Sequence, residues 1–223
     1  MAAYILGSIP SAVWIGKIFY GIDVREYGSG NAGATNTFRV LGKKAGIPVL
    51  IIDIMKGYAA VQLAVLIGNY LPGTQQFVNF KLTLGVAALM GHIFPCLAGF
   101  RGGKGIATLL GILSGVHPQA ALCCAGIFFV TLLWSNYISL SSMVSAVAFP
   151  IIIMFVYHET VRSMNVFSMF VTVLVLITHQ KNIERLLITA VAGISMHFRT
   201  TQGPEIIKSK KSFSYGLTAH SFN

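Results

Sequence analysis

Residues 82–115 read LTLGVAALMGHIFPCLAGFRGGKGIATLLGILSG. A long apolar run, residues 82–98, is followed by a short segment with three glycines and two cations, residues 100–105, and then by a second apolar run, residues 106–115. Apolar runs joined by short glycine-rich or basic segments are typical of chains that cross a membrane several times. The stretch therefore predicts an all-α, polytopic integral membrane protein.

The composition supports this class. Hydrophobic residues make up 55% of the 223 residues, charged residues make up 10%, and the mean hydropathy is +0.74. Soluble domains contain about a quarter charged residues, so this chain cannot cover a water-facing surface in the usual way. We expect one membrane domain, residues 1–199, and a flexible basic C-terminal tail, residues 200–223.

The apolar segments suggest about seven transmembrane or partial helices. They occupy residues 1–20, 45–71, 82–98, 106–115, 118–134, 137–157, 164–178 and 186–198. A spanning helix needs about 20 residues, so several segments are too short to cross alone. His117-Pro118 interrupts the pair of segments 106–115 and 118–134, which predicts a re-entrant hairpin or two partial helices. Residues 1–20 predict a retained helix rather than a cleaved signal peptide, because no basic stretch precedes the apolar run.

The cations separate into two groups along the chain, and the formal net charge is +10. Lys81 and Arg162 fall on one side of the predicted membrane. The other side receives Arg25, Arg39, Lys43, Lys44, Arg101, Lys104, Lys181, Arg185, Lys208, Lys210 and Lys211. The positive-inside rule places this second group and the C-terminus in the cytoplasm. This topology signal, helped by attraction to anionic lipid, is enough to explain most of these charges, and nucleic acid is not an expected partner.

Two glycine-containing segments are candidate phosphate sites. In residues 100–105, glycines would let backbone N–H groups face an anion, and Arg101 and Lys104 would add positive charge beside a helix start. An ordinary basic loop at the membrane edge fits this segment equally well. In residues 28–39, Asn and Thr alternate with glycines ahead of Arg39, which favours a second anion site followed by a helix start over a flexible linker.

The remaining polar residues near the apolar segments each have a structural and a functional interpretation. His92 is typical of a core histidine with one hydrogen bond. Asp53 and Lys56, at i and i+3 inside an apolar segment, predict a mutually neutralising pair rather than a functional site. Ser139, Ser141 and Ser142 are typical of hydroxyls that bond to helix backbone. His179 and Asn182 share one helix face, which fits an interfacial helix or a binding face equally well.

The sequence resembles the PlsY family of bacterial acyl-phosphate:glycerol-3-phosphate acyltransferases. The resemblance rests on Gly7-Ser8-Ile9-Pro10-Ser11, on the Ser-Gly-Asn-x-Gly-Ala-Thr-Asn run that begins at Ser29, and on residues 91–105 from Gly-His to Lys-Gly. It continues through His179-x-x-Asn182-Ile183-x-Arg185-Leu186. These motifs occur in the same order over residues 1–187.

The resemblance implies transfer of a fatty acyl group from acyl phosphate to the 1-hydroxyl of sn-glycerol 3-phosphate, which gives lysophosphatidic acid and inorganic phosphate. It implies the catalytic residues His179, Lys104, Arg39, Asn182 and Ser139. It implies binding of phosphate or substrate by Ser29, Gly30, Asn31, Gly33, Thr35, Asn36, Gly102, Gly103 and Gly105. Which segment binds which phosphate is left open.

We expect direct transfer without an acyl-enzyme, since acyl phosphate is already activated. The base is either His179 or the substrate's own phosphate. No cofactor and no metal are expected, because no Asp/Glu cluster occurs. The expected partners are both substrates, membrane lipid and, by resemblance, the upstream enzyme that forms acyl phosphate, all at a bacterial cell membrane with the site facing the cytoplasm. A transporter for a phosphorylated solute and a non-catalytic scaffold are the competing hypotheses.

Overall fold

The structure is a computed structural model that describes residues 1–184 and Ile188. The chain divides into two units, Met1–His179 and Gln180–Asn223, and each is described by itself. The predicted apolar segment 186–198 lies outside the described residues except for Ile188, and the predicted tail, residues 200–223, lies outside them entirely. The fold described below is that of the first unit.

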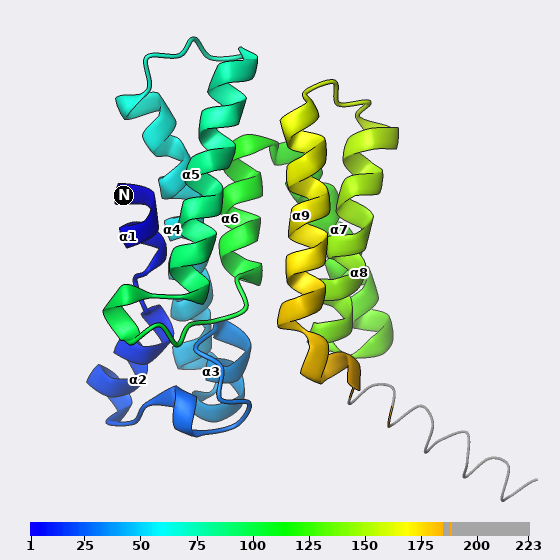
Figure 1. Cartoon of the computed structure of the whole chain (residues 1–223). Helices are drawn as coiled ribbons and strands as arrows, with labels where there is room; N and C mark the ends of the chain where they lie inside the picture. Colours follow the sequence, from blue (N-terminus) through cyan, green and yellow to red (C-terminus); the bar gives the residue numbers. More distant parts are fainter. Residues whose placement is uncertain (185–187, 189–223) are drawn as a thin grey trace, which may run out of the picture. The chain divides into compact units, whose positions relative to one another are not determined.

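Every regular element of the described residues is helical, which confirms the predicted all-α class (Figure 1). The α-helices are α1 (Ala2–Gly7), α2 (Ser11–Tyr20), α3 (Ala34–Leu41), α4 (Lys43–Ile67), α5 (Gln75–Ile93), α6 (Ile106–Val116), α7 (Pro118–Ser135), α8 (Ile138–Ile151) and α9 (Arg162–Thr178). Short helical turns, η1 (Val24–Glu26), η2 (Cys96–Ala98) and η3 (Ile152–Val156), flank or extend them.

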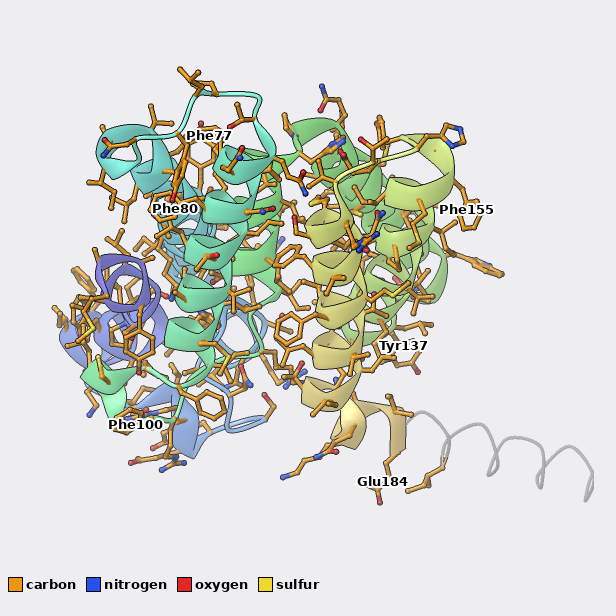
Figure 2. The ribbon with its side chains drawn as sticks, turned by 45° about the horizontal axis from the view of Figure 1, so that its top comes forward. Phe77, Phe80, Phe100, Tyr137, Phe155 and Glu184 are labelled. Atoms are coloured by element: carbon orange, nitrogen blue, oxygen red, sulfur yellow. The ribbon has the colours of Figure 1, made fainter. Side chains whose placement is uncertain are left out.

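Among the residues that the structure describes, four helical stretches are long and apolar enough to cross a membrane. They are Lys43–Ile67, Gln75–Ala98, Pro118–Ser135 and Ile138–Val156. Large apolar side chains are exposed on them, among them Leu66, Leu133 and Phe155, and Figure 2 shows Phe155 pointing away from the helices. A surface of this kind is stable against lipid and not against water. The chain is an integral membrane protein.

The prediction of a single helix over residues 1–20 was wrong. The chain breaks between α1 and α2, because Pro10 has no backbone N–H and its ring obstructs a continuous helix. At the break the Ile9 carbonyl oxygen accepts the Ser11 N–H over 3.1 Å and a hydrogen bond from Lys56 Nζ over 2.8 Å. A charged residue of α4 thus stabilises the bend.

Glycines allow α4 and α6 to pack closely. A Cβ at Gly57 would overlap the Thr108 carbonyl oxygen, and a Cβ at Gly111 would overlap the Ile54 carbonyl oxygen. Small residues at such crossings let helix backbones approach in a membrane, where no hydrophobic effect drives helices together. Since Gly57 lies in the middle of α4, the first turn of α6 stands level with the middle of α4 and not with its start.

The helices form two groups within this unit, as Figure 1 shows. α1, α4, α5 and α6 pack together in one group, α7, α8 and α9 form the other, and α5 contacts α9. The predicted interruption at His117-Pro118 is present: His117 Nδ1 accepts the Ala120 N–H over 3.2 Å and starts α7. α6 packs mainly on α4 and α7 mainly on α8, so the interrupted pair consists of two helices with different main partners.

Candidate active site

The two glycine-containing segments predicted from the sequence lie against each other. The first loop, residues 28–33, leads into α3, and the glycine-rich loop, residues 99–105, leads into α6. The Ala32 N–H donates a hydrogen bond to the Gly102 carbonyl oxygen over 3.4 Å. Both loops belong to the end of the unit at which α2 and α3 lie (Figure 1). They therefore form one continuous surface.

Arg25 connects the two loops by a second route. Its Nη1 donates to the Ala98 carbonyl oxygen over 2.7 Å and to the Arg101 carbonyl oxygen over 3.3 Å. Asp23 holds the guanidinium from the other side, with Nη2 to Oδ2 at 2.7 Å and Nε to Oδ1 at 2.9 Å. Hydrogen bonding from Arg25 holds the pKa of Asp23 well below its usual range. From the sequence, Arg25 was predicted only as a charge on the cytoplasmic side, and this contact was not predicted.

The glycine-rich loop uses part of its backbone to end α5. The Gly102 N–H donates to the Ile93 carbonyl oxygen over 3.2 Å, and the Gly103 N–H donates to the His92 carbonyl oxygen over 3.1 Å. These two N–H groups, which were expected to face a phosphate, are therefore engaged by backbone carbonyl oxygens. Gly105 has φ +84° and begins α6 without a side-chain cap, so the first-turn N–H groups of α6 are the better anion donors.

Asn36 holds the shape of the first loop. Its Oδ1 accepts the Ser29 N–H over 2.8 Å and the Ser29 hydroxyl over 3.1 Å. Its Nδ2 donates to the carbonyl oxygens of Val24, over 2.8 Å, and of Tyr27, over 3.1 Å. Asn36 is buried, with 1% of its surface exposed. This arrangement favours a loop-shaping role for Asn36 over direct contact with a phosphate.

The other site residues that were predicted within residues 28–39 are exposed or half-buried. Ser29 and Gly30 are exposed in the loop, and Asn31 and Gly33 are half-buried. Thr35 and Arg39 lie on α3 rather than in a loop, are both exposed, and share one helix face at i and i+4. Gly33 starts α3 without a side-chain cap, so the first turn of α3 offers a second set of helix N–H donors.

His179 ends α9 as a buried imidazole with 3% of its surface exposed. Its Nδ1 lies 2.9 Å from the Val175 carbonyl oxygen, which can only accept, so Nδ1 carries the proton and the neutral ring presents Nε2 as an acceptor. Burial and the nearby positive charge of Lys104 lower the pKa of His179 to about 4. His179 and Lys104 are thus brought together from distant parts of the sequence, and the histidine is neutral at physiological pH.

The chain matches the model of one protein family over residues 1–189, described as glycerol-3-phosphate acyltransferase. The chain belongs to this family. Similar proteins of the same name come from Enterococcus faecalis, 45% identical over 193 residues, and Staphylococcus carnosus, 43% identical over 187 residues. These alignments cover 83% of this chain and 86% and 91% of the relatives.

Two solved structures are similar to this member of the glycerol-3-phosphate acyltransferase family. Both are crystal structures of PlsY, described as an integral membrane glycerol 3-phosphate acyltransferase. Its glycerol 3-phosphate form is 34% identical with a TM-score of 0.74, covering 84% of this chain and 90% of that one. Its lysophosphatidic acid form is 32% identical with a TM-score of 0.70, covering 84% and 89%. The predicted family and membrane fold are confirmed.

The three serines at the start of α8 in this acyltransferase-family chain differ in their hydrogen bonds. The hydroxyls of Ser141 and Ser142 donate to the carbonyl oxygens of Tyr137 and Ile138, each over 2.9 Å. Ser141 and Ser142 therefore bond to helix backbone, as expected. Ser139 is half-buried and has no side-chain hydrogen bond to another described residue, so its hydroxyl is available to a ligand.

Asn182 belongs to the second unit and lies in the helical residues 180–184. Its placement beside His179, expected from the i, i+3 spacing, stays a prediction. No group of three or more His, Cys, Asp or Glu side chains among the described residues could hold a metal ion.

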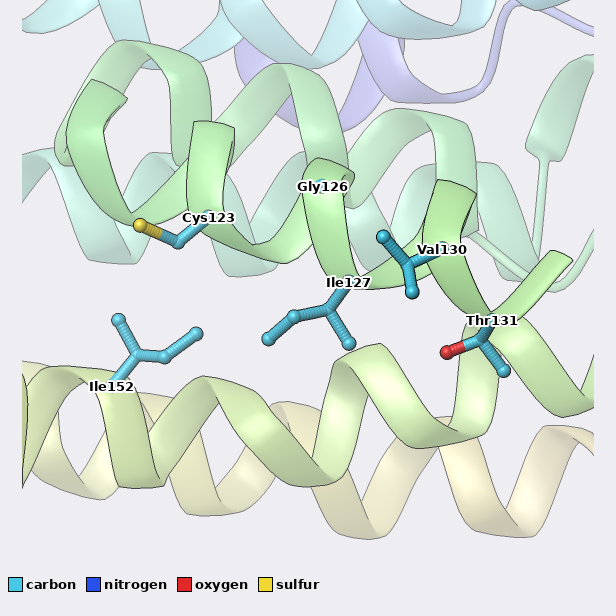
Figure 3. Close-up of a pocket in the computed structure, with 6 residues that line it drawn as sticks. All are labelled: Cys123, Gly126, Ile127, Val130, Thr131 and Ile152. Carbon is cyan, nitrogen blue, oxygen red and sulfur yellow. The ribbon is translucent and has the colours of Figure 1, made fainter. Parts of the chain in front are cut away.

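An apolar groove of about 520 Å³ lies on α7 and at the start of η3 (Figure 3). It is lined by Cys123, Gly126, Ile127, Val130, Thr131 and Ile152. None of the residues predicted for the site lines it. The predicted site is therefore the loop surface and its histidine rather than this groove.

Proposed function

We propose that this member of the glycerol-3-phosphate acyltransferase family transfers a fatty acyl group from acyl phosphate to the 1-hydroxyl of sn-glycerol 3-phosphate. The products are lysophosphatidic acid and inorganic phosphate. One observation carries the proposal: two glycine-containing loops, each leading to an uncapped helix start, are hydrogen-bonded to each other at Ala32 and Gly102. Two neighbouring anion sites suit a reaction in which both substrates are phosphates.

The site residues have the following proposed roles. The start of α6 with Gly105 and Lys104 holds one phosphate, shaped by Gly102 and Gly103. The first loop with Ser29, Gly30, Asn31 and Gly33 holds the other, with Thr35 and Arg39 from α3 and with Asn36 as its brace. Ser139 and Asn182 bind the glycerol phosphate. Either loop can take either phosphate.

The proposed chemistry is a direct attack of the glycerol hydroxyl on the acyl carbonyl carbon. The carbon–oxygen bond to the new ester forms, the bond to the phosphate oxygen breaks, and inorganic phosphate leaves. Lys104 and the helix N–H groups stabilise negative charge on the carbonyl oxygen and on the leaving phosphate. His179 Nε2 accepts a hydrogen bond from the hydroxyl and orients it, while the hydroxyl proton goes to His179 or to a substrate phosphate.

The low pKa of His179 favours the orienting role. A base with a pKa of about 4 is weak at pH 7, and acyl phosphate needs little help because phosphate is a good leaving group. His179→Ala should then raise the KM for glycerol 3-phosphate more than it lowers kcat. A loss confined to kcat would identify His179 as the general base.

We further propose that the site and the C-terminus face the cytoplasm of a bacterial cell membrane, as the positions of the cations suggest. Acyl phosphate is hydrolytically labile, so an enzyme that forms it must work at the same membrane face, and that upstream enzyme is the proposed partner. Because no metal or cofactor enters the proposed chemistry, turnover should continue in a chelator. Loss of turnover in EDTA, restored by a divalent cation, would contradict this.

The test uses purified protein with acyl phosphate and radiolabelled glycerol 3-phosphate. Lysophosphatidate should form with acyl phosphate and not with an acyl thioester, and Lys104→Ala and Arg39→Ala should lower its formation. Lys44→Ala, an exposed cation outside the proposed site, is the matched control and should retain activity. Product from the thioester alone would contradict acyl phosphate as the acyl donor. No product from either donor would overturn the activity, and uptake of glycerol 3-phosphate by sealed vesicles would favour a transporter.

A further inference from the structure

A cluster of buried polar side chains lies directly behind the glycine-rich loop and outside the proposed catalytic residues. Asp53 of α4 exposes 1% of its surface, Lys56 of α4 and His92 of α5 expose 5% each, and Thr108 of α6 is fully buried. Lys56 Nζ lies 2.9 Å from Asp53 Oδ1, and the Ser11 hydroxyl donates to the same oxygen over 2.7 Å. The cluster joins four helices at one point.

His92 is the member of this cluster that reaches the loop. Its Nδ1 lies 3.1 Å from Thr108 Oγ1 and 3.7 Å from Asp53 Oδ1, which fixes one edge of the ring. Its other edge, at Nε2, faces Gly103: a Cβ added at Gly103 would overlap Nε2 and would lie 3.0 Å from Cε1. The His92 carbonyl oxygen also accepts the Gly103 N–H. Side chain and backbone of one residue therefore support the same loop residue.

The cluster is poorly built for stability alone. A buried ion pair loses much solvation, and Asp53 Oδ2 is buried with no hydrogen-bond partner among the described residues. Removal of that cost by apolar side chains would often be neutral or stabilising. The charged pair does meet the His92 ring through Asp53 Oδ1, and Thr108 contacts the same Nδ1 edge at the point where α6 begins and the loop ends.

We propose that His92 is a positioning residue of the acyltransfer site, whose Nε2 edge supports Gly103 and thereby sets the position of the loop that presents Lys104 and the start of α6. Asp53, Lys56 and Thr108 orient the His92 ring from the opposite edge. His92 does not touch substrate and acts through the loop. The inference rests on the proposed acyltransferase function.

The first experiment separates the two edges of the ring. In His92→Asn the side-chain amide can take the place of Nδ1 and leaves the space beside Gly103 empty, whereas in His92→Gln the amide reaches the place of Nε2. His92→Asn should lower kcat/KM by about 100-fold, since a misplacement of about 1 Å costs that much, and His92→Gln should restore most of the loss.

The kinetic pattern distinguishes positioning from simple loss of folded protein. In His92→Asn the KM for one of the two phosphate substrates should rise while the KM for the other stays unchanged, because the loop holds one phosphate. A variant that merely unfolds in part lowers the apparent kcat and leaves both KM values as they were. Equal activities for the Asn and Gln variants, or unchanged KM values, would overturn the proposal.

The second experiment is a double-mutant cycle with a matched control. Gly103→Ala should impair turnover because its Cβ displaces the His92 ring, and His92→Ala in the same chain should relieve that overlap. The double variant should then be no worse than His92→Ala alone. Gly102→Ala is the control, since its Cβ would overlap the backbone oxygen of His92, and removal of the ring cannot relieve that contact.

If two substitutions act independently, their fold losses of activity multiply, to within about twofold. Losses for Gly103→Ala and His92→Ala that multiply in the double variant would therefore reject the proposed contact. Each kinetic measurement is paired with thermal unfolding in detergent, which gives the folded fraction. Failure of the wild-type protein to make lysophosphatidate would reject the proposed function. An active wild type with no coupling between His92 and Gly103 would reject only the positioning role.

Discussion

His179 shows how one residue can be both buried and chemically useful. Its Nδ1 is committed to the Val175 carbonyl oxygen of its own helix, so the ring cannot turn freely and Nε2 has one direction in which to accept a proton or a hydrogen bond. Lys104 lies close enough to disfavour the charged ring. A neutral histidine can accept a hydrogen bond from a hydroxyl without repelling the positive charge of Lys104.

His179 should titrate near pH 4 in the substrate-free protein, measured by NMR of the imidazole in detergent. Lys104→Met should raise its pKa, because a positive neighbour is removed, but not to the ordinary value of 6.5, because burial is the larger cause. Lys44→Met is the control and should leave the titration unchanged. A wild-type pKa near 6.5 would contradict a buried His179 beside the positive charge of Lys104.

The same pKa has a consequence for stability with a definite sign. Since the unfolded histidine takes up a proton near pH 6.5 and the folded one only near pH 4, the unfolded state binds more protons between these values. The contribution of His179 to the free energy of unfolding should therefore fall as the pH drops from 6.5 to 4 and stay constant above 6.5.

Removal of one partner of the Asp53–Lys56 pair should lower the free energy of unfolding more than removal of both charges. Lys56→Met leaves the Asp53 carboxylate buried without its cation and removes one of the two hydrogen bonds to the Ile9 carbonyl oxygen, which should cost about 3–5 kcal/mol of stability. The double variant Asp53→Asn with Lys56→Met removes both charges and should recover much of the loss. Thermal unfolding in detergent gives both values, and equal losses for the single and double variants would argue against the pair.

At the scale of the element, the close packing of α4 on α6 depends on glycines, which have no side chain at the points of contact. Gly111→Val should destabilise the protein by about 1–3 kcal/mol, because its side chain would meet the Ile54 backbone, which cannot turn aside as a side chain can. Gly126→Ala in α7 is the matched control: no atom lies within 4 Å of its Cβ, and alanine favours the helix. Unfolding temperatures in detergent that fall equally for both variants would contradict the assigned contact.

The helices could be predicted from the sequence where local composition determines them. Long apolar runs and the His117-Pro118 interruption led to α4 through α9, because hydrophobicity and the missing proline N–H act within a few residues. Residues 1–20 were predicted as one retained helix, and the break at Pro10 was not predicted. The same proline rule, applied there, would have predicted it.

The site was less predictable because its contacts join distant segments. Two anion loops were expected from their composition, and their meeting at Ala32 and Gly102 agrees with a shared surface. That Asn36 braces the first loop, and that Gly102 and Gly103 use their N–H groups to end α5, depends on the path of the backbone. No local pattern in a single sequence indicates such partners.

At the scale of the whole molecule, the native cysteines allow the sidedness of the loop surface to be tested. Cys96 is exposed in η2, immediately before the glycine-rich loop. If that surface faces the cytoplasm, a membrane-impermeant maleimide should label Cys96 only after the cells are permeabilised. Cys96→Ser gives the background from the other cysteines. Labelling of Cys96 in intact cells would reverse the proposed orientation.

The short α6 gives the site a depth as well as a shape. Because α6 begins level with the middle of α4, its positive end is set back from the surface that the start of α4 defines. A positive helix end that is set back in this way is screened less by salt and solvent, so it should bind an anion more strongly than a helix end on an open surface. If the donor is acyl phosphate, as proposed, the same placement would also limit the access of water, which favours transfer of the acyl group to the alcohol over hydrolysis.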